Sequence, residues 1–110
     1  MKLDDSAILA DVAEFAGIAA EIVARGHDHF EADNADGAIV RLAAHMLVIN
    51  LSAAVGQFSA DFQAAHPDVR WGSIRGMRHR LAHTYRGVNE ALVWEVMQRD
   101  IPALVAQLGR

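Results

Sequence analysis

Apolar residues recur along the first part of the chain at intervals of three and four, which is the repeat of a helix with one buried face. The stripe consists of Ile8, Val12, Phe15, Ala19 and Ile22. Acidic residues and Ser6 precede it and favour a helix start, and Gly26 favours a stop. We therefore predict a first helix over residues 4–24.

A second helix is predicted over residues 37–58, with Asp36 as its N-cap. Its first turns carry Arg41 and His45, whereas residues 46–55 are apolar on nearly every side. A helix of that kind is covered on more than one side, either at the centre of a bundle or at a subunit interface.

Two more helical regions follow a connector at 59–70. One runs from about 71 to 83, and the other begins after Asn89 and restarts at 100–102, where an Asp cap precedes a Pro. No stretch alternates with a period of two, so we predict no strand. Short connections between long helices predict an all-α, up-and-down antiparallel bundle of four to five helices.

The composition fits one globular domain over residues 1–110. The chain has a mass of 12.0 kDa and 53% hydrophobic residues, enough for one core. It lacks cysteine, which excludes disulfide scaffolds, thiolate metal sites and cysteine nucleophiles. The acidic, polar start M-K-L-D-D-S is unlike a signal peptide, and no apolar run approaches the ~20 residues of a membrane span. We expect a soluble, cytoplasmic protein that does not contact membranes.

Positive charge is concentrated in one part of a chain whose net charge is −4. Between Asp68 and Glu90 there is no acidic residue, and this gap holds Arg70, Arg75, Arg78, Arg80 and Arg86. Guanidinium groups pair with phosphate oxygens, so the cluster suits a phosphate-bearing partner such as RNA. The alternative is a solvated helix face without a partner.

Residues 74–85 are the chemically dense segment of the chain, with three Arg, two His and the only Tyr. Histidine can move a proton near neutral pH, and arginine can stabilise a pentavalent phosphoryl transition state. The set suits cleavage of RNA by its own 2′-OH without a metal or cofactor. The alternative is a basic helix end that caps carbonyl groups.

The spacing within this segment constrains the site. Arg78 and His83 are five residues apart, about 140° around a regular helix at ~100° per residue. They cannot point to one spot from one regular helix. Either the helix ends between them, or two copies of the chain assemble the site across a dimer axis.

The second half of the chain resembles the HepT-like toxins of the HEPN fold, whose motif Arg-x4-His-x-Tyr matches Arg78, His83 and Tyr85. Further matches follow in order along the chain: His66-Pro67-Asp68 with Trp71, Ile74-Arg75-Gly76-Met77, Gly87-Val88, Val93-Trp94-Glu95 and Asp100-Ile101-Pro102. The first half is similar only as generic helices.

This resemblance implies a HEPN-like homodimer with the motif lining a cleft at its interface. The activity would be that of a metal-independent endoribonuclease toxin that needs no cofactor, with Arg78 and His83 as the catalytic pair. The partner would be a nucleotidyltransferase antitoxin, which would silence the toxin by adding AMP to Tyr85.

Three neighbours are expected to support the pair: His79, which stands where the family usually has Asn or Asp, together with Arg75 and Arg80. One departure is Ser52-Ala53, where family members often carry Gly-Glu, so any role of that Glu is missing or moved here. Two other functions fit the same residues. One is a non-catalytic HEPN domain that binds nucleotide or RNA, and the other is a helical module that docks an acidic partner.

Other residues are better interpreted as structural. His27 and His29 lie in an acidic stretch, 27–36, predicted to be a solvated loop rather than a metal site. Trp71 and Trp94 have the spacing of core anchors rather than of base-stacking platforms. His45 is expected in the core or at an interface, with a supporting role in the site as the alternative.

Overall fold

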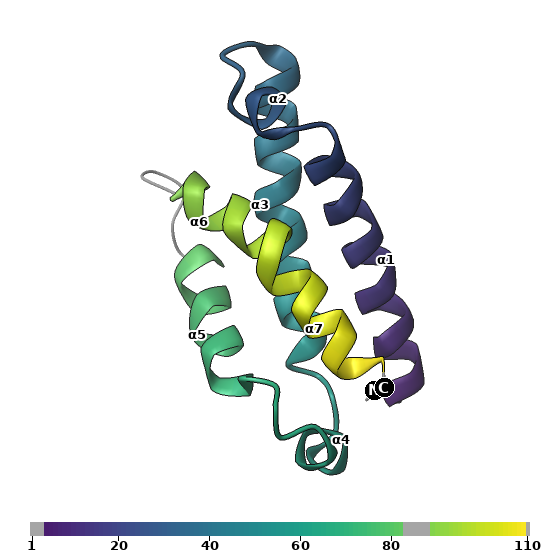
Figure 1. The fold of residues 1–110 in the computed structure, drawn as a ribbon. Coiled ribbons are helices and arrows are strands. Elements are labelled where there is room, and N and C mark those ends of the chain that lie inside the picture. Colours follow the sequence, from purple (N-terminus) through teal and green to yellow (C-terminus); the bar gives the residue numbers. More distant parts are fainter. Residues whose placement is uncertain (1–3, 83–88, 110) are drawn as a thin grey trace.

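Two long helices, α1 (Asp5–Ala24) and α3 (Ala35–Val55), lie side by side along the molecule (Figure 1). The computed structural model describes residues 4–82 and 89–109, and every regular element among them is a helix. The buried stripe of α1 contains Ile8, Val12, Ala19 and Ile22, as the spacing predicts. The predicted bounds of the first helix are therefore confirmed to within a residue.

The connection between these two helices holds a short helix, α2 (His27–Glu31), where the sequence predicted a loop. Gly26 turns the chain at a φ of 98°, a conformation that favours glycine. The next helix starts at Asn34, whose side chain accepts a hydrogen bond from the N–H of Gly37 at 2.8 Å. The predicted cap, Asp36, lies instead in the first turn. A Cβ on Gly37 would lie 2.1 Å from the carbonyl oxygen of Ala32, so only glycine fits this approach.

Ser59 caps α4 (Ala60–Ala65), and its hydroxyl accepts a bond from the N–H of Phe62 at 3.0 Å. A ring cluster packs at this end of the bundle, where Phe58 stacks on Phe62 and both meet Trp71 edge-on. Trp71 begins α5 (Trp71–Ala82), which packs on α3.

The C-terminal part is one continuous helical run of three pieces: α6 (Glu90–Glu95), a π-helical turn (Val96–Asp100) and α7 (Ile101–Leu108). Asn89 caps it as predicted, accepting a bond from the N–H of Leu92 at 3.0 Å. The predicted last segment is present, because α7 begins at Ile101 with Pro102 in its first turn and ends at Leu108. Asp100 stands at the predicted N-cap position, but it is helical and its side chain makes no capping bond. The wider π turn accommodates Pro102, which cannot donate a backbone hydrogen bond.

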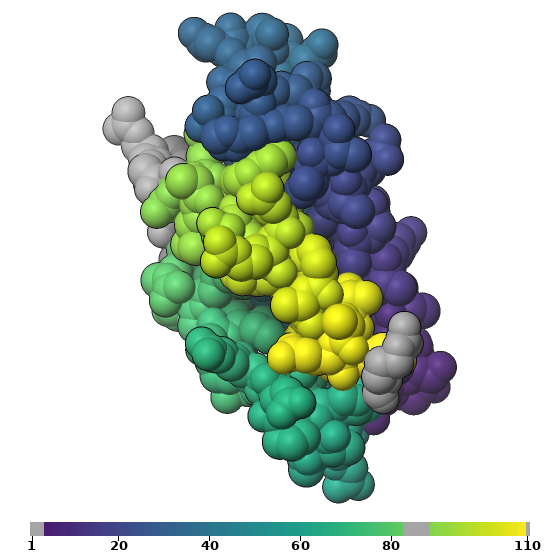
Figure 2. Space-filling view, in the orientation of Figure 1, coloured from purple at the N-terminus to yellow at the C-terminus, as the bar shows by residue number. Residues whose placement is uncertain are grey.

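The long helices α1, α3, α5 and the α6–α7 run alternate in direction and form an all-α, HEPN-like bundle, as predicted (Figure 1). The α6–α7 run crosses one face of the bundle and covers it between α1 and α5 (Figure 2). Within the described part of the chain, α3 alone has the length and apolar character of a membrane-spanning helix. It is the central helix of the bundle and packs against α1, α2, α5 and α6.

Candidate functional site

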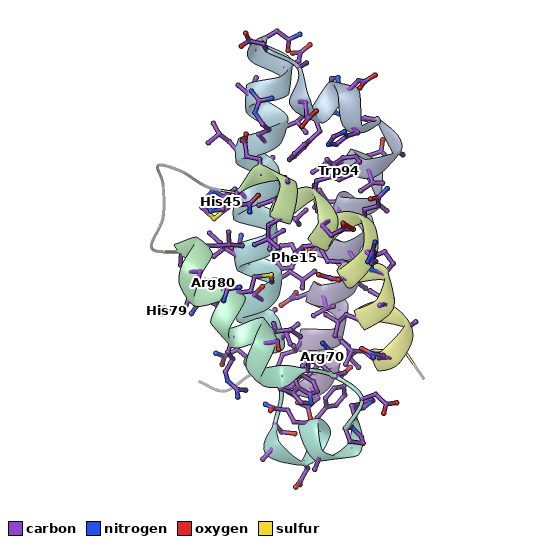
Figure 3. All side chains as sticks on the ribbon, turned by 60° about the vertical axis from the view of Figure 1, so that its left-hand side comes forward. Phe15, His45, Arg70, His79, Arg80 and Trp94 are labelled. Carbon is purple, nitrogen blue, oxygen red and sulfur yellow. The ribbon has the colours of Figure 1, made fainter. Side chains whose placement is uncertain are left out.

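The outer face of α5 carries the basic residues of the predicted site. Arg75, Arg78, His79 and Arg80 are exposed, whereas Leu81 is buried in the core. Trp71, Ile74 and Met77 are partly buried and face the bundle. Figure 3 shows His79 and Arg80 on α5, with His45 above them on α3. The sequence thus places its apolar residues inward and its arginines outward on a single helix.

Two of these arginines have no acidic partner among the described residues. No ion pair joins Arg75 or Arg78 to any acid within residues 4–82 and 89–109. The cause lies in the sequence, which has no Asp or Glu between Asp68 and Glu90. Their guanidinium groups can therefore bind phosphate without first breaking an internal ion pair.

The rest of the motif falls on residues outside the described parts of the chain. His83 and Tyr85 belong to residues 83–88, and α5 is described up to Ala82. The predicted 140° separation of Arg78 and His83 accordingly stays a prediction.

A second polar cluster, on α3, faces the ends of α5 and α6. The Nε2 of His45 lies 3.1 Å from the carbonyl oxygen of Leu81, within hydrogen-bond distance. The Nη1 of Arg41 donates to two carbonyl oxygens at the end of α2, those of Phe30 at 2.8 Å and Ala32 at 2.9 Å. Its Nε lies 3.3 Å from a carboxylate oxygen of Glu90, in the first turn of α6.

These side chains line a cleft of about 240 Å³. The lining residues are Phe30, Ala38, Arg41, Leu42, His45, Glu90 and Val93. Sequence reasoning missed Glu90. Two weak signals were available in the sequence. Arg41 and His45 are polar residues four positions apart on an apolar helix, and Glu90 is the acid that ends the basic stretch.

The exposed apolar residues of α3 lie mostly before the apolar segment 46–55, in which the sequence analysis placed them. Residues 46–55 are apolar on nearly every side, but Leu47, Val48, Leu51 and Val55 are buried within the chain itself. The exposed large residues lie mostly earlier on the helix: Ile39, Leu42 and Met46 are 63%, 72% and 57% exposed. The exposed apolar surface of α3 is therefore mainly this stripe, beside Arg41 and His45.

A larger cavity, of about 340 Å³, lies on the inner side of α5 between α3 and α7. Arg70, Ser73 and Asp100 are among its polar lining residues. Ser52, one of the two residues where the family pattern departs, also lines it, and its hydroxyl donates to the carbonyl of Val48 at 2.7 Å. The cavity includes none of the exposed basic residues of the outer face.

The two tryptophans are packing anchors, as predicted. The indole N–H of Trp71 donates to the carbonyl of His66 at 3.1 Å. The ring of Trp94 packs against Phe30 and His27, with centroids 5.2 and 4.9 Å apart. His27 also lies 3.5 Å from Glu31, and no group of three potential metal ligands occurs among the described residues.

Comparison with known proteins places the chain among ribonucleases of one family. Residues 13–110 match the family described as "Ribonuclease HepT-like". A protein of Methanocaldococcus jannaschii named "Putative RNase MJ1380" is 28% identical over 103 residues, covering 94% of this chain and 92% of that protein. No solved structure matches the chain.

Shorter matches reach higher identity. "Putative RNase TTE0752" of Caldanaerobacter subterraneus is 40% identical over 55 residues, and "Probable ribonuclease HepT" of Thermococcus cleftensis is 39% identical over 44. These alignments span about half and two-fifths of the relatives' lengths. Since the family match covers nearly the whole sequence, the chain belongs to the HepT-like ribonuclease family.

Proposed function

We propose that the protein is a metal-independent endoribonuclease that acts as a cytoplasmic toxin and is silenced by a nucleotidyltransferase antitoxin. The observation that carries the proposal is the outer face of α5, where Arg75 and Arg78 are exposed without an acidic partner among the described residues. This face leads directly into the segment that holds the motif residues His83 and Tyr85.

The proposed chemistry is transesterification within the RNA. A histidine, His83 of either subunit, takes the proton of the 2′-OH as its oxygen attacks the neighbouring phosphorus. Arg78 stabilises the charge on the pentavalent phosphorus, and an acid returns a proton to the leaving 5′ oxygen. The products are a 2′,3′-cyclic phosphate and a 5′-OH. His79, Arg75 and Arg80 help to hold the RNA backbone.

A homodimer supplies the second proton-transfer group in this scheme. The exposed stripe Ile39, Leu42 and Met46 supports it, because large apolar side chains gathered on one helix face mark interaction surfaces. Pairing two such stripes would cover the cleft beside His45 and bring two copies of the chain together near the ends of their α5 helices.

The dimer is tested with Leu42→Glu, which places a charge in the stripe at a side chain 72% exposed. Ile18→Glu is the control, since Ile18 is an exposed apolar residue of α1 outside the stripe. Sedimentation at micromolar concentration should give a dimer for the wild type and the control, and a monomer for Leu42→Glu. A monomeric wild type would overturn the dimer.

Silencing is proposed to act at Tyr85. Its hydroxyl attacks the α-phosphate of ATP, pyrophosphate leaves, and the hydroxyl proton goes to solvent or base. The added phosphate pairs with arginines meant for RNA and blocks the cleft by its volume. Co-expression with a nucleotidyltransferase antitoxin should add mass in steps of one AMP. These steps should vanish in Tyr85→Phe, and toxicity should return.

The activity is tested by incubating purified protein with structured and unstructured RNA, with and without EDTA. Cleavage that survives chelation and leaves cyclic phosphate ends supports the proposal. RNA binding without cleavage would favour a non-catalytic domain, and neither binding nor cleavage would favour a helical docking module. Loss of cleavage on chelation would show the metal-free mechanism to be wrong.

A further inference from the structure

We infer that Arg41 and His45 are positioning residues, which hold α5 and α6 in place on the two sides of the motif segment. The inference rests on the proposed ribonuclease activity, but the contacts that support it are made by residues outside the motif. Arg41 and His45 lie one helical turn apart on α3, so their side chains share a face. His45 contacts the last described turn of α5, and Arg41 contacts the start of α6.

The His45 contact lies in the last described turn of α5. The ring Nε2 of His45 lies 3.1 Å from the carbonyl oxygen of Leu81, whose own side chain is buried. Leu81 lies three residues after Arg78 and two before His83. A shift of this carbonyl would therefore move the direction in which the chain enters the motif segment.

The Arg41 contacts fix the start of α6. Its Nη1 donates to both carbonyls at the end of α2, and its Nε faces the carboxylate of Glu90. The side chain is 20% exposed, and these contacts use two of its guanidinium nitrogens, Nε and Nη1. Arg41 is thus committed to internal partners, in contrast to Arg75 and Arg78, and is better suited to positioning than to binding phosphate.

The two contacts act together because they come from one rigid helix. Leu81 and Glu90 are nine residues apart in the sequence and lie on either side of residues 83–88. By contacting both, α3 sets the distance between Leu81 and Glu90. The same helix carries the exposed stripe Ile39, Leu42 and Met46, so the positioning pair lies next to the proposed dimer face.

The first test compares three variants of α3 in steady-state RNA cleavage. His45→Leu keeps similar bulk without a donor, whereas His45→Gln keeps a side-chain N–H that can reach the carbonyl of Leu81. Asn50→Ala is the control, an exposed residue about one turn further along the same helix. We expect His45→Leu to lower kcat about 10- to 100-fold, as misplacement of a catalytic group does. KM should change less, since Arg75 and Arg78 still bind RNA.

Recovery of most of kcat in His45→Gln, with Asn50→Ala unchanged, supports the positioning role. Equal kcat in His45→Leu and wild type would overturn it, and so would a change confined to KM. Arg41→Lys should also lower kcat, because one ammonium group cannot reach both carbonyls and Glu90 together. Glu90→Gln should have a smaller effect, since an amide oxygen still accepts a bond from the Nε.

A second measurement does not depend on catalysis. Hydrogen–deuterium exchange should speed up in His45→Leu for peptides covering 79–82, and in Arg41→Lys for peptides covering 90–95. Exchange in α1 should stay unchanged in both variants. If wild-type protein cleaves no RNA, the proposed function fails, but this exchange pattern still tests the anchoring. Unchanged exchange at 79–82 and 90–95 would overturn the inference even in an active enzyme.

Discussion

The helices α1 and α5 are both amphipathic, yet they serve the molecule in different ways. α1 buries four residues and packs on α3, the π turn and α7. α5 buries only Leu81 among its residues, packs chiefly on α3, and exposes its basic residues. The difference separates a helix that stabilises the fold from one that presents chemistry. Substitutions in α1 should therefore change stability, and substitutions on the outer face of α5 should change activity.

The largest effect is expected from Arg78→Ala. Loss of a group that stabilises the transition state or moves a proton costs about 10²–10⁴-fold in rate, and the same is expected of His83→Ala. The stability should change by less than about 0.5 kcal/mol, because Arg78 is exposed and has no ion-pair partner among the described residues. Cleavage rates and urea unfolding measure the two effects.

The control for Arg78→Ala is Arg99→Ala, which removes an arginine 77% exposed on the π turn. Arg99 pairs with Glu95 at 3.3 Å and lies outside α5. An equal loss of cleavage in both variants would show that general positive charge, rather than the face of α5, carries the activity.

The next effect is expected from Ile8→Ala in α1. Ile8 is 1% exposed, and removing a buried Ile side chain typically costs about 2–5 kcal/mol. The free energy of unfolding should fall by that amount, while kcat of the molecules that remain folded should hold. A variant that is as stable as wild type but inactive would contradict the division between the two helices.

A smaller effect is expected from Asp5→Ala, which breaks a long-range contact of α1. The Asp5 carboxylate accepts bonds from the backbone N–H and the hydroxyl of Ser59, at 2.9 and 2.7 Å. Hydrogen bonds to charged groups contribute about 1.5–3 kcal/mol, and partial exposure lowers this to about 1–2 kcal/mol. Urea unfolding measures the loss, with Asp11→Ala, an exposed acid of the same helix, as the control.

The local or long-range origin of each helix decides whether it could be predicted from the sequence. α1 was predictable because its apolar repeat is local, and Asn89 was predictable as a cap because a cap binds a residue only three positions away. α2 was not, because its stretch is polar and its buried residue, Phe30, packs on the distant Trp94. Tertiary contact, rather than local pattern, favours that helix.

The candidate site divides in a similar way. The basic face of α5 followed from an acid-free stretch of sequence together with helical spacing. The contacts of Arg41 with Glu90 and of His45 with Leu81 join residues 49 and 36 positions apart, and no periodicity predicts such pairs. Local repeats therefore indicate which residues face outward, whereas the folded bundle is needed to show what holds them there.

The smallest effect is expected from His79→Asn, on the outer face of α5. His79 is exposed and follows Arg78, at the place where the HepT-like pattern usually has a polar Asn or Asp. Asn keeps a hydrogen-bonding side chain but cannot exchange a proton near neutral pH. We expect kcat to fall less than about tenfold, well short of the 10²–10⁴-fold typical of a lost acid–base group. Cleavage rates measured across pH 5–9 for wild type, His79→Asn and His83→Ala separate the two roles. A loss in His79→Asn as large as in His83→Ala, with a changed pH profile, would make His79 the second proton-transfer group. The proposed site would then need only one subunit for both protons, which would remove the catalytic reason for a dimer.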